Sequence, residues 1–233
     1  MARQPRLCLP HRLHLLLLCG HDGQAIARDD QDRQACIRTL QTVATEQGVR
    51  LHAYGLSHQR LALLATPVDS TGLSRWVQGI GRRYVRDFNA RHGRRGTLWD
   101  GRFRTGVLQT ERHGLDGMLY CDWLAVTDGD ASHPSQWPWS SHGHYAGHTA
   151  QRGLVALAPY WGLGNTPFAR EEAYQKCALA FKKTKENQWI EDTARRGLAH
   201  GDAAFVRAME ALSGRRLRPG QPGRPAKHKP VPN

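Results

Sequence analysis

The sequence predicts an α+β protein: a ferredoxin-like antiparallel sheet with helices on one face, followed by C-terminal helices and a basic tail. The segments between residues 13 and 126 follow the order strand, helix, strand, strand, helix, strand, helix. This order is the split β-α-β arrangement of a ferredoxin-like domain with an added helix. A continuous apolar run at the start and two segments with apolar residues at helical spacing support the assignment.

Four segments predict the strands of this sheet. They are Leu13–Cys19, Val49–Leu56, Leu61–Thr66 and Phe103–Gln109. The first also has features of a secretory signal, since arginines precede it, but the apolar run is short and contains His14. A buried strand with His14 as a hydrogen-bonded core residue is the better interpretation. No apolar run approaches the length of a membrane span.

Three segments predict the helices of the same domain: Asp29–Gln47, Ser70–Arg91 and Arg112–Val126. Asp29 or Asp30 can cap the first of them, and Gly48 ends it. The apolar positions of the second, which include Leu73, Ile80 and Phe88, recur at helical spacing.

The chain divides into three parts by composition. Residues 1–127 form the ferredoxin-like domain, and residues 128–213 form an extension with helices predicted over Arg170–Lys183, Gln188–Ala199 and Asp202–Ser213. Residues 214–233 are basic, contain five prolines and no acidic residue, and cannot build a core. We expect this tail to be disordered by itself.

The charge balance points to a polyanionic partner. Lys and Arg number 33 against 20 Asp and Glu, which gives a formal net charge of +13. Nucleic acid is the first candidate, an anionic membrane surface the second, and a basic protein without such a partner the third. The five cysteines form no C-x-x-C pair, so a disulfide framework or a cysteine zinc site is not expected. This fits a cytoplasmic protein, and with DNA as its partner a nucleoid-associated one.

Several motifs occur in an order that resembles the REP-associated tyrosine transposases, relatives of the small single-tyrosine insertion-sequence enzymes. Residues 96–103, Gly-Thr-Leu-Trp-Asp-Gly-Arg-Phe, are close to the signature G-x-L-W-x-G-R-F of that family. Residues 137–141 match its W-P-W-S-S box. Residues 29–33, 52–54, 79–89 and 190–216 are also similar to the family. The resemblance extends over nearly the whole chain.

The resemblance implies a particular chemistry. Enzymes of this family cut single-stranded DNA at the foot of a hairpin, and a tyrosine forms a covalent 5′-phosphotyrosine link. A divalent metal polarises the phosphate. Tyr120, in Leu-Tyr-Cys of the third predicted helix, matches the position of the nucleophile. Without the resemblance, Tyr120 would be interpreted as a half-buried aromatic residue of an amphipathic helix.

The metal ligands of the family do not carry over to this chain. The family holds its metal with two histidines of an N-H-x-H-L-L strand and with an asparagine four residues after the tyrosine. Arg60, Ala62 and Leu124 occupy these positions, and none of them can ligate a metal. Shifting the alignment by two residues places His58 at the first ligand position but supplies no second ligand. We expect no cofactor; Mg²⁺ or Mn²⁺ would bind only if substitute ligands exist.

A second H-x-H spacing lies at residues 142–144, after the W-P-W-S-S box. It falls outside the strand in which the family carries its ligands. We interpret it as a polar loop and not as a metal site.

The predicted DNA-binding residues are concentrated between residues 82 and 104. They are Arg82, Arg83, Arg86, Arg94, Arg95, Trp99, Arg102 and Arg104. Arginines beside a tryptophan suit phosphate contact combined with base stacking. The first three could instead form a solvated helix face. In the tail, Arg224 within Gly-Arg-Pro could enter a minor groove, or the tail could only aid solubility.

Three functions remain compatible with the sequence. The first is a transposase-like protein that binds hairpin or single-stranded DNA with little or no cleavage, as a monomer or a homodimer. The second is an active tyrosine transposase and single-strand endonuclease that uses substitute metal ligands. The third is a transposase relic without function.

Overall fold

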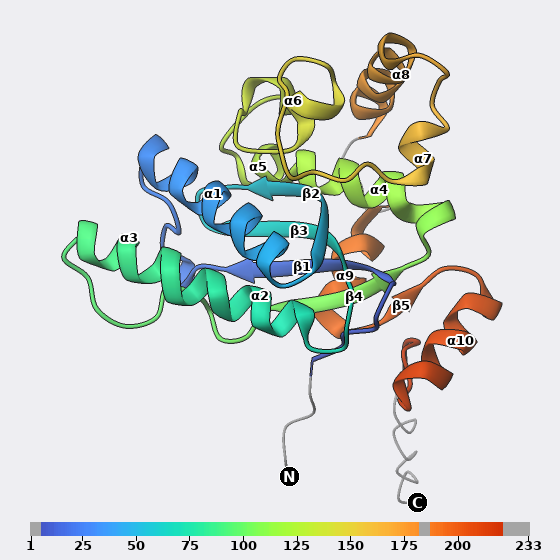
Figure 1. The fold of residues 1–233 in the computed structure, drawn as a ribbon, viewed down its shortest axis with the longest axis horizontal. Coiled ribbons are helices and arrows are strands. Elements are labelled where there is room, and N and C mark those ends of the chain that lie inside the picture. Colours follow the sequence, from blue (N-terminus) through green and yellow to red (C-terminus); the bar gives the residue numbers. More distant parts are fainter. Residues whose placement is uncertain (1–5, 182–186, 221–233) are drawn as a thin grey trace, which may run out of the picture.

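The computed structural model describes residues 6–181 and 187–220. A five-stranded sheet of order β2-β3-β1-β4-β5 lies at its centre (Figure 1). The strands are β1 (Leu13–Cys19), β2 (Val49–Leu56), β3 (Arg60–Pro67), β4 (Arg104–Leu108) and β5 (Ala199–His200). The first four pair antiparallel in the ferredoxin-like order, which confirms the predicted fold class. The short β5 adds to β4 in parallel.

Helices surround this sheet. They are α1 (Asp30–Glu46), α2 (Gly72–Ile80), α3 (Arg86–Arg91), α4 (Thr110–Asp122), α5 (Leu124–Asp128), α6 (His142–Tyr145), α7 (Ala158–Trp161), α8 (Pro167–Ala180), α9 (Gln188–Arg196) and α10 (Ala203–Ser213). Asp29 caps α1 by accepting a hydrogen bond from the Asp32 amide, as the sequence suggested. The end predicted for α8, at Lys183, lies outside the described residues.

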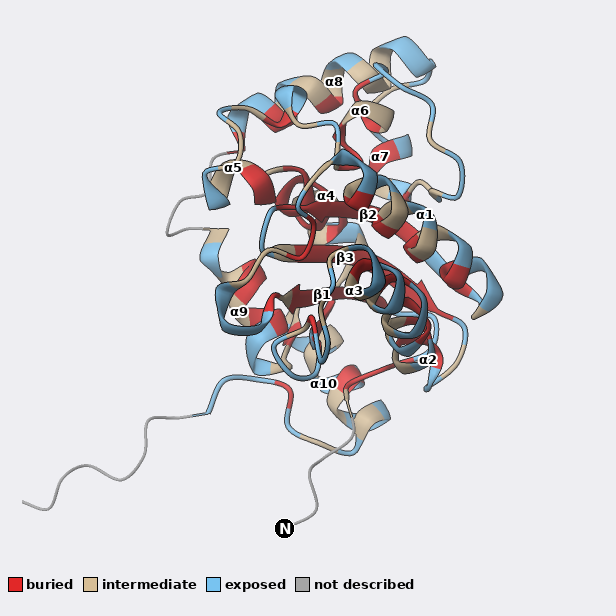
Figure 2. Cartoon of the chain, turned by 90° about the vertical axis from the view of Figure 1, so that its left-hand side faces the viewer, coloured by how far each residue is buried: buried red, intermediate tan, exposed pale blue. Residues whose placement is uncertain are grey.

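Helices cover both faces of the sheet, which corrects the expectation that they lie on one face. Alternate residues of β1 point to opposite sides: Leu16 and Leu18 join the hydrophobic cluster under α1 and α2, whereas Leu15 and Leu17 join the cluster under α4 and α9. The strands between the two layers are buried (Figure 2). A sheet that is apolar on both faces needs a second layer, and α4 supplies it together with the C-terminal helices.

Two further elements differ from the prediction. The segment Ser70–Arg91 was expected as one helix, but a π-helical turn at Gly81–Val85 separates α2 from α3 and places Tyr84 in the core, where its hydroxyl donates to the Ile26 carbonyl at 2.5 Å. The helix predicted to reach Ala199 ends at Arg196, because Gly197 adopts a left-handed conformation (φ 68°) that terminates it. Ala199 then enters the sheet as part of β5.

Part of the predicted basic tail is packed against the core. Leu217 is fully buried in a cluster with Leu7 and Met209, and the carbonyl of Leu217 accepts a hydrogen bond from the Ala199 amide at 2.8 Å. The segment after α10 therefore returns to the core at Leu217, although α10 itself ends at Ser213. Residues 221–233, including Arg224, lie outside the described residues. In the described part of the chain, no helix is long and apolar enough to cross a bilayer.

Two glycines allow α4 and α9 to approach the sheet closely. A Cβ atom at Gly55 of β2 would lie 1.9 Å from the carbonyl oxygen of Cys121 in α4. A Cβ atom at Gly106 of β4 would lie 2.5 Å from the carbonyl oxygen of Thr193 in α9. Both neighbours are backbone atoms, so only a hydrogen at these positions leaves room for the helices.

We predict that Gly106→Ala destabilises the fold by about 1–3 kcal/mol, because α9 must move away from β4. Gly81→Ala is the control: its added Cβ meets no atom within 4 Å, and its helical φ of −57° suits alanine. We expect the control to be neutral or to stabilise by up to about 1 kcal/mol. Urea denaturation of the three proteins measures both effects. Equal stability of Gly106→Ala and wild type would contradict the close packing of α9.

Candidate functional site

Tyr120 lies on the buried face of α4, which packs against the sheet. Its side chain packs in the same hydrophobic cluster as Ala62 of β3, and the residue is only 5% exposed. The hydroxyl donates a hydrogen bond to Oε2 of Glu191 in α9 at 3.0 Å. Tyr120 therefore has a carboxylate as its immediate partner, and this carboxylate comes from the C-terminal extension.

The same carboxylate binds Arg60, the residue at the first ligand position of the family's metal. Nη1 of Arg60 lies 3.3 Å from Oε1 of Glu191. The other edge of the guanidinium makes a two-pronged contact with Asp128 at the end of α5, in which Nε donates to Oδ2 at 2.8 Å. Arg195 also donates to Glu191, from one helical turn further along α9, at 2.6 Å. One guanidinium thus joins β3, α5 and α9.

This ion-pair network, made of Arg60, Asp128, Glu191 and Arg195, is balanced in charge. Two guanidinium groups face two carboxylates, and the side chains of Arg60, Asp128 and Glu191 are between 10% and 17% exposed. Burial alone would lower the pKa of Arg60, but its hydrogen bonds and its attraction to Asp128 raise it. Burial, together with the charge of Glu191, raises the pKa of Tyr120 well above its usual range. The tyrosine is held in its neutral form.

The other two ligand positions of the family are apolar. Ala62 and Leu124 are buried and belong to the hydrophobic cluster around Tyr120. Among the described residues, no group of three or more His, Cys, Asp or Glu side chains is arranged to hold a metal ion. The four positions to which the resemblance assigns the nucleophile and the metal ligands, Arg60, Ala62, Tyr120 and Leu124, thus lie in one region of the structure. Their side chains do not include the ligands that a metal ion would need.

We predict strong energetic coupling within the network. Arg60→Met leaves two largely buried carboxylates without their guanidinium and should cost about 3 kcal/mol, and Asp128→Asn should also be costly. In a double-mutant cycle the two changes should couple by about 1–3 kcal/mol. The exposed pair Arg83–Glu46 is the matched control, in which Arg83→Met and Glu46→Gln should couple by about 0–1 kcal/mol. Denaturant titrations of both cycles provide the values, and equal coupling energies would show that the Arg60 network contributes no more than a surface pair.

The histidines considered as alternative ligands have other roles. His58 is exposed, and its backbone amide donates to Asp130. His142, predicted in a polar loop, instead begins the short helix α6 and is buried, with Nδ1 at 3.1 Å from Asp122. The correction has a structural reason: Asp122 is fully buried and needs hydrogen-bond donors. His14 is a satisfied core histidine as predicted, because it accepts from the Leu9 amide, and burial lowers its pKa to about 4.

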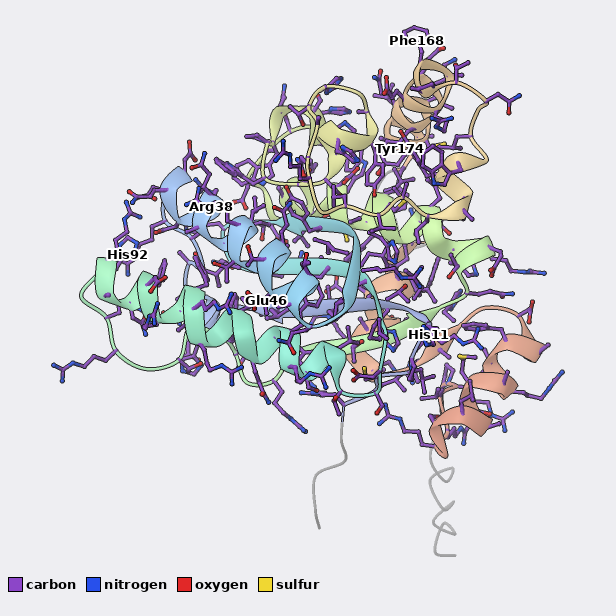
Figure 3. The ribbon with its side chains drawn as sticks, viewed as in Figure 1. His11, Arg38, Glu46, His92, Phe168 and Tyr174 are labelled. Atoms are coloured by element: carbon purple, nitrogen blue, oxygen red, sulfur yellow. The ribbon has the colours of Figure 1, made fainter. Side chains whose placement is uncertain are left out.

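The W-P-W-S-S box serves the packing of β2. Nε1 of Trp137 donates to the Leu56 carbonyl at 2.7 Å, and the Leu56 amide donates to the Trp139 carbonyl at 3.0 Å. Ser141 donates to the buried Asp122, which also accepts from Tyr174 of α8 (labelled in Figure 3). The box covers the free edge of β2 and links it to the extension, so its residues have a structural explanation here.

The predicted DNA-binding arginines of the helical segment 81–91 are partly neutralised. Arg83 forms an ion pair with Glu46 of α1 at 2.7 Å, and Arg86 lies 2.9 Å from Asp87. Glu46 is labelled on α1 in Figure 3. Arg82 is exposed on the same surface. Only part of the formal positive charge of this segment therefore remains available to an anion.

The predicted DNA-binding residues that follow α3 differ in their contacts and exposure. Arg94 holds the loop by donating to Asn89 at 2.8 Å and to Gln24 at 2.5 Å, whereas Arg95 is exposed. Trp99 is half-buried and forms a bridge to Gly20. Arg102 and Arg104 are exposed beside α9, on the other side of the sheet from α2. The predicted residues thus form two separate basic surfaces.

Sequence reasoning missed Asp128, Glu191 and Arg195, which complete the network. Two signals pointed to them. An arginine in a buried strand requires a carboxylate partner, and Glu191 and Arg195 have the i, i+4 spacing of a helical ion pair. Neither signal shows which acidic residue meets Arg60, because the partners lie 68 and 131 residues away.

Comparison with solved structures supports the fold. A REP-associated tyrosine transposase bound to a REP hairpin matches with a TM-score of 0.52 and 13% identity, over 67% of this chain and 99% of that chain. A protein from Deinococcus radiodurans R1, provisionally assigned as a transposase, matches 49% of this chain and 89% of its own with 17% identity and a TM-score of 0.35. No protein-family model and no curated protein matches the sequence. The chain therefore has a transposase-like fold.

Proposed function

We propose that this protein is a degenerate member of the REP-associated tyrosine transposase family that binds hairpin or single-stranded DNA without metal-dependent cleavage. The observation that carries the proposal is the ion-pair network, because it fills the position of the family's metal with a neutralised guanidinium. The fold shared with a transposase that was solved on a DNA hairpin supports the choice of partner. The formal net charge of +13 supports it as well.

The geometry around Tyr120 disfavours attack on a phosphodiester. A tyrosine nucleophile needs an ionised or readily deprotonated hydroxyl, a phosphate in line with it, and positive charge near the transferred phosphate. Here the hydroxyl is buried and donates to Glu191. Arg60 and Arg195 are already paired with carboxylates. An incoming phosphate would have to displace these carboxylates before it met any positive charge.

The basic surfaces on the two sides of the sheet are the regions that we assign to DNA. Arg82 and Arg95 are exposed on one of them, and Arg102 and Arg104 are exposed on the other. Arg224 would add a contact from the segment beyond the described residues. We also propose that the protein acts at the nucleoid. A homodimer is compatible with this function, but the function does not require one.

We predict DNA binding that weakens steeply with salt. Neutralising ~4 phosphates should give a log–log salt slope near −3 on single strands. Arg82→Ala combined with Arg95→Ala should flatten this slope by about 1.4, since each removes a phosphate contact. Arg38→Ala, which removes a charge from the exposed surface of α1, should leave the slope unchanged. Fluorescence anisotropy with a labelled hairpin and a labelled single strand measures the slopes. A slope near zero for wild type would contradict DNA binding and favour a relic.

We predict no covalent protein–DNA adduct when the protein is incubated with hairpin-flanked single-stranded DNA and Mg²⁺ or Mn²⁺. The physical reason is the missing ligand set at Arg60, Ala62 and Leu124. Denaturing electrophoresis of end-labelled DNA detects both nicking and an adduct. An adduct that forms in wild type and disappears in Tyr120→Phe would overturn the proposal and establish an active enzyme with substitute ligands.

A further inference from the structure

An arginine-lined pocket lies outside the ion-pair network, between the start of β4, the last turn of α9 and residues 214–220. Its volume is about 290 Å³. Four separate stretches of the chain contribute arginines to it: the N-terminal segment, the segment leading into β4, the end of α9 and the segment after α10. These arginines are Arg6, Arg102, Arg104, Arg195, Arg196, Arg215 and Arg216.

The charge of this arginine pocket is strongly one-sided. Among the described residues that line it, none is acidic. Arg195 is paired with Glu191 of the network, while Arg104 and Arg196 are exposed at the pocket. The C-terminal end of α9 also faces this region and contributes roughly half a negative charge. That partial charge is small beside the guanidinium groups of Arg104, Arg196 and Arg216, so the pocket favours an anion.

The arginine pocket continues into a narrow groove that reaches Trp99. This groove, about 60 Å³ in volume, shares Arg102, Arg104 and Arg195 with the pocket. Trp99, Asp100 and Phe103 line its other part. The cationic pocket and the half-buried tryptophan are thus joined by a groove over β1 and β4 in which three arginines accompany one carboxylate.

We propose that the arginine pocket binds a backbone phosphate of single-stranded DNA, with an adjacent base against Trp99. This assignment rests on the proposed function and specifies where the single strand lies. Guanidinium groups bind phosphate through paired hydrogen bonds and stay charged at every physiological pH. A protein aromatic ring can stack on a base only where the base is free of its own stack, which favours a single strand over a duplex.

The location also separates this strand from Tyr120. Arg195 contacts Glu191, and Glu191 accepts the hydrogen bond of Tyr120. Tyr120 is not among the residues that line the arginine pocket. The pocket therefore serves to hold DNA and does not present a phosphodiester to Tyr120.

The test uses the full-length protein, a hairpin without extension, the same hairpin with a single-stranded extension, and an isolated single strand of deoxythymidine. The pocket variant carries Arg104→Ala and Arg196→Ala, which leave the Arg60 network intact. Its affinity for the extended hairpin should fall by about tenfold or more, and its salt slope on the single strand should flatten by about 1.4, as expected for two lost phosphate contacts. Its affinity for the hairpin without extension should change by less than about twofold, because that DNA lacks the strand that enters the pocket.

A control variant keeps the result interpretable. The control Arg38→Ala with Arg152→Ala removes the same number of exposed charges elsewhere and should not change the difference between the two hairpins. Thermal unfolding of each variant verifies its fold.

The outcomes distinguish the pocket from the proposed function. If wild type binds DNA and the pocket variant behaves as the control variant does, the pocket assignment is overturned while DNA binding stands. If inorganic phosphate stabilises wild type but no DNA binds at low salt, the pocket is a small-anion site and both proposals fail. Equal affinity for single-stranded RNA of the same length would overturn the assignment to DNA.

Discussion

The largely buried guanidinium of Arg60 joins the central sheet to the C-terminal extension. It lies at the start of β3, in a part of the sheet that helices cover on both sides, and a charge in such a place requires counter-charges. Asp128 and Glu191 supply them from α5 and α9. The C-terminal extension is therefore held to the sheet by electrostatics as well as by the cluster it shares with α4. Because Glu191 also accepts from Tyr120, the same contact fixes the state of the tyrosine.

The sequence predicted the central sheet closely, since each strand follows from local information. β1 and β2 match their predicted ranges, and β3 and β4 differ from theirs only at the ends. Their apolar runs are long enough to exclude a surface location. β5 could not be predicted, because two residues carry no periodicity and their place depends on Gly197 ending α9. The second helical layer was missed for a related reason: a strand buried on both faces has no alternation that shows which helices cover it.

The candidate site shows the same division between local and long-range information. Alignment of motifs placed Tyr120, Arg60 and Ala62 together, and the structure brings them into one region. Counting charges along the chain overstated the exposed positive charge of the helical segment 81–91, because Glu46 of a different helix pairs with Arg83. Conversely, the most basic pocket draws arginines from four separate stretches. No local window of the sequence contains enough of them to reveal it.

The surroundings of Tyr120 and the arginine pocket differ in charge. This difference would allow one fold to bind DNA without cleaving it. A divalent metal would add positive charge beside Tyr120 and draw a phosphate there. Arg60 and Arg195 carry two positive charges and Asp128 and Glu191 carry two negative ones, so the four side chains of the network beside the tyrosine sum to zero. The arginine pocket keeps its charge, because none of its described lining residues is acidic. Under the proposed function, a DNA strand gains most of its attraction at the pocket and little at Tyr120. Restoring cleavage would need more than a new metal ligand at position 62, since the pairing of Arg60 with two carboxylates would also have to be undone.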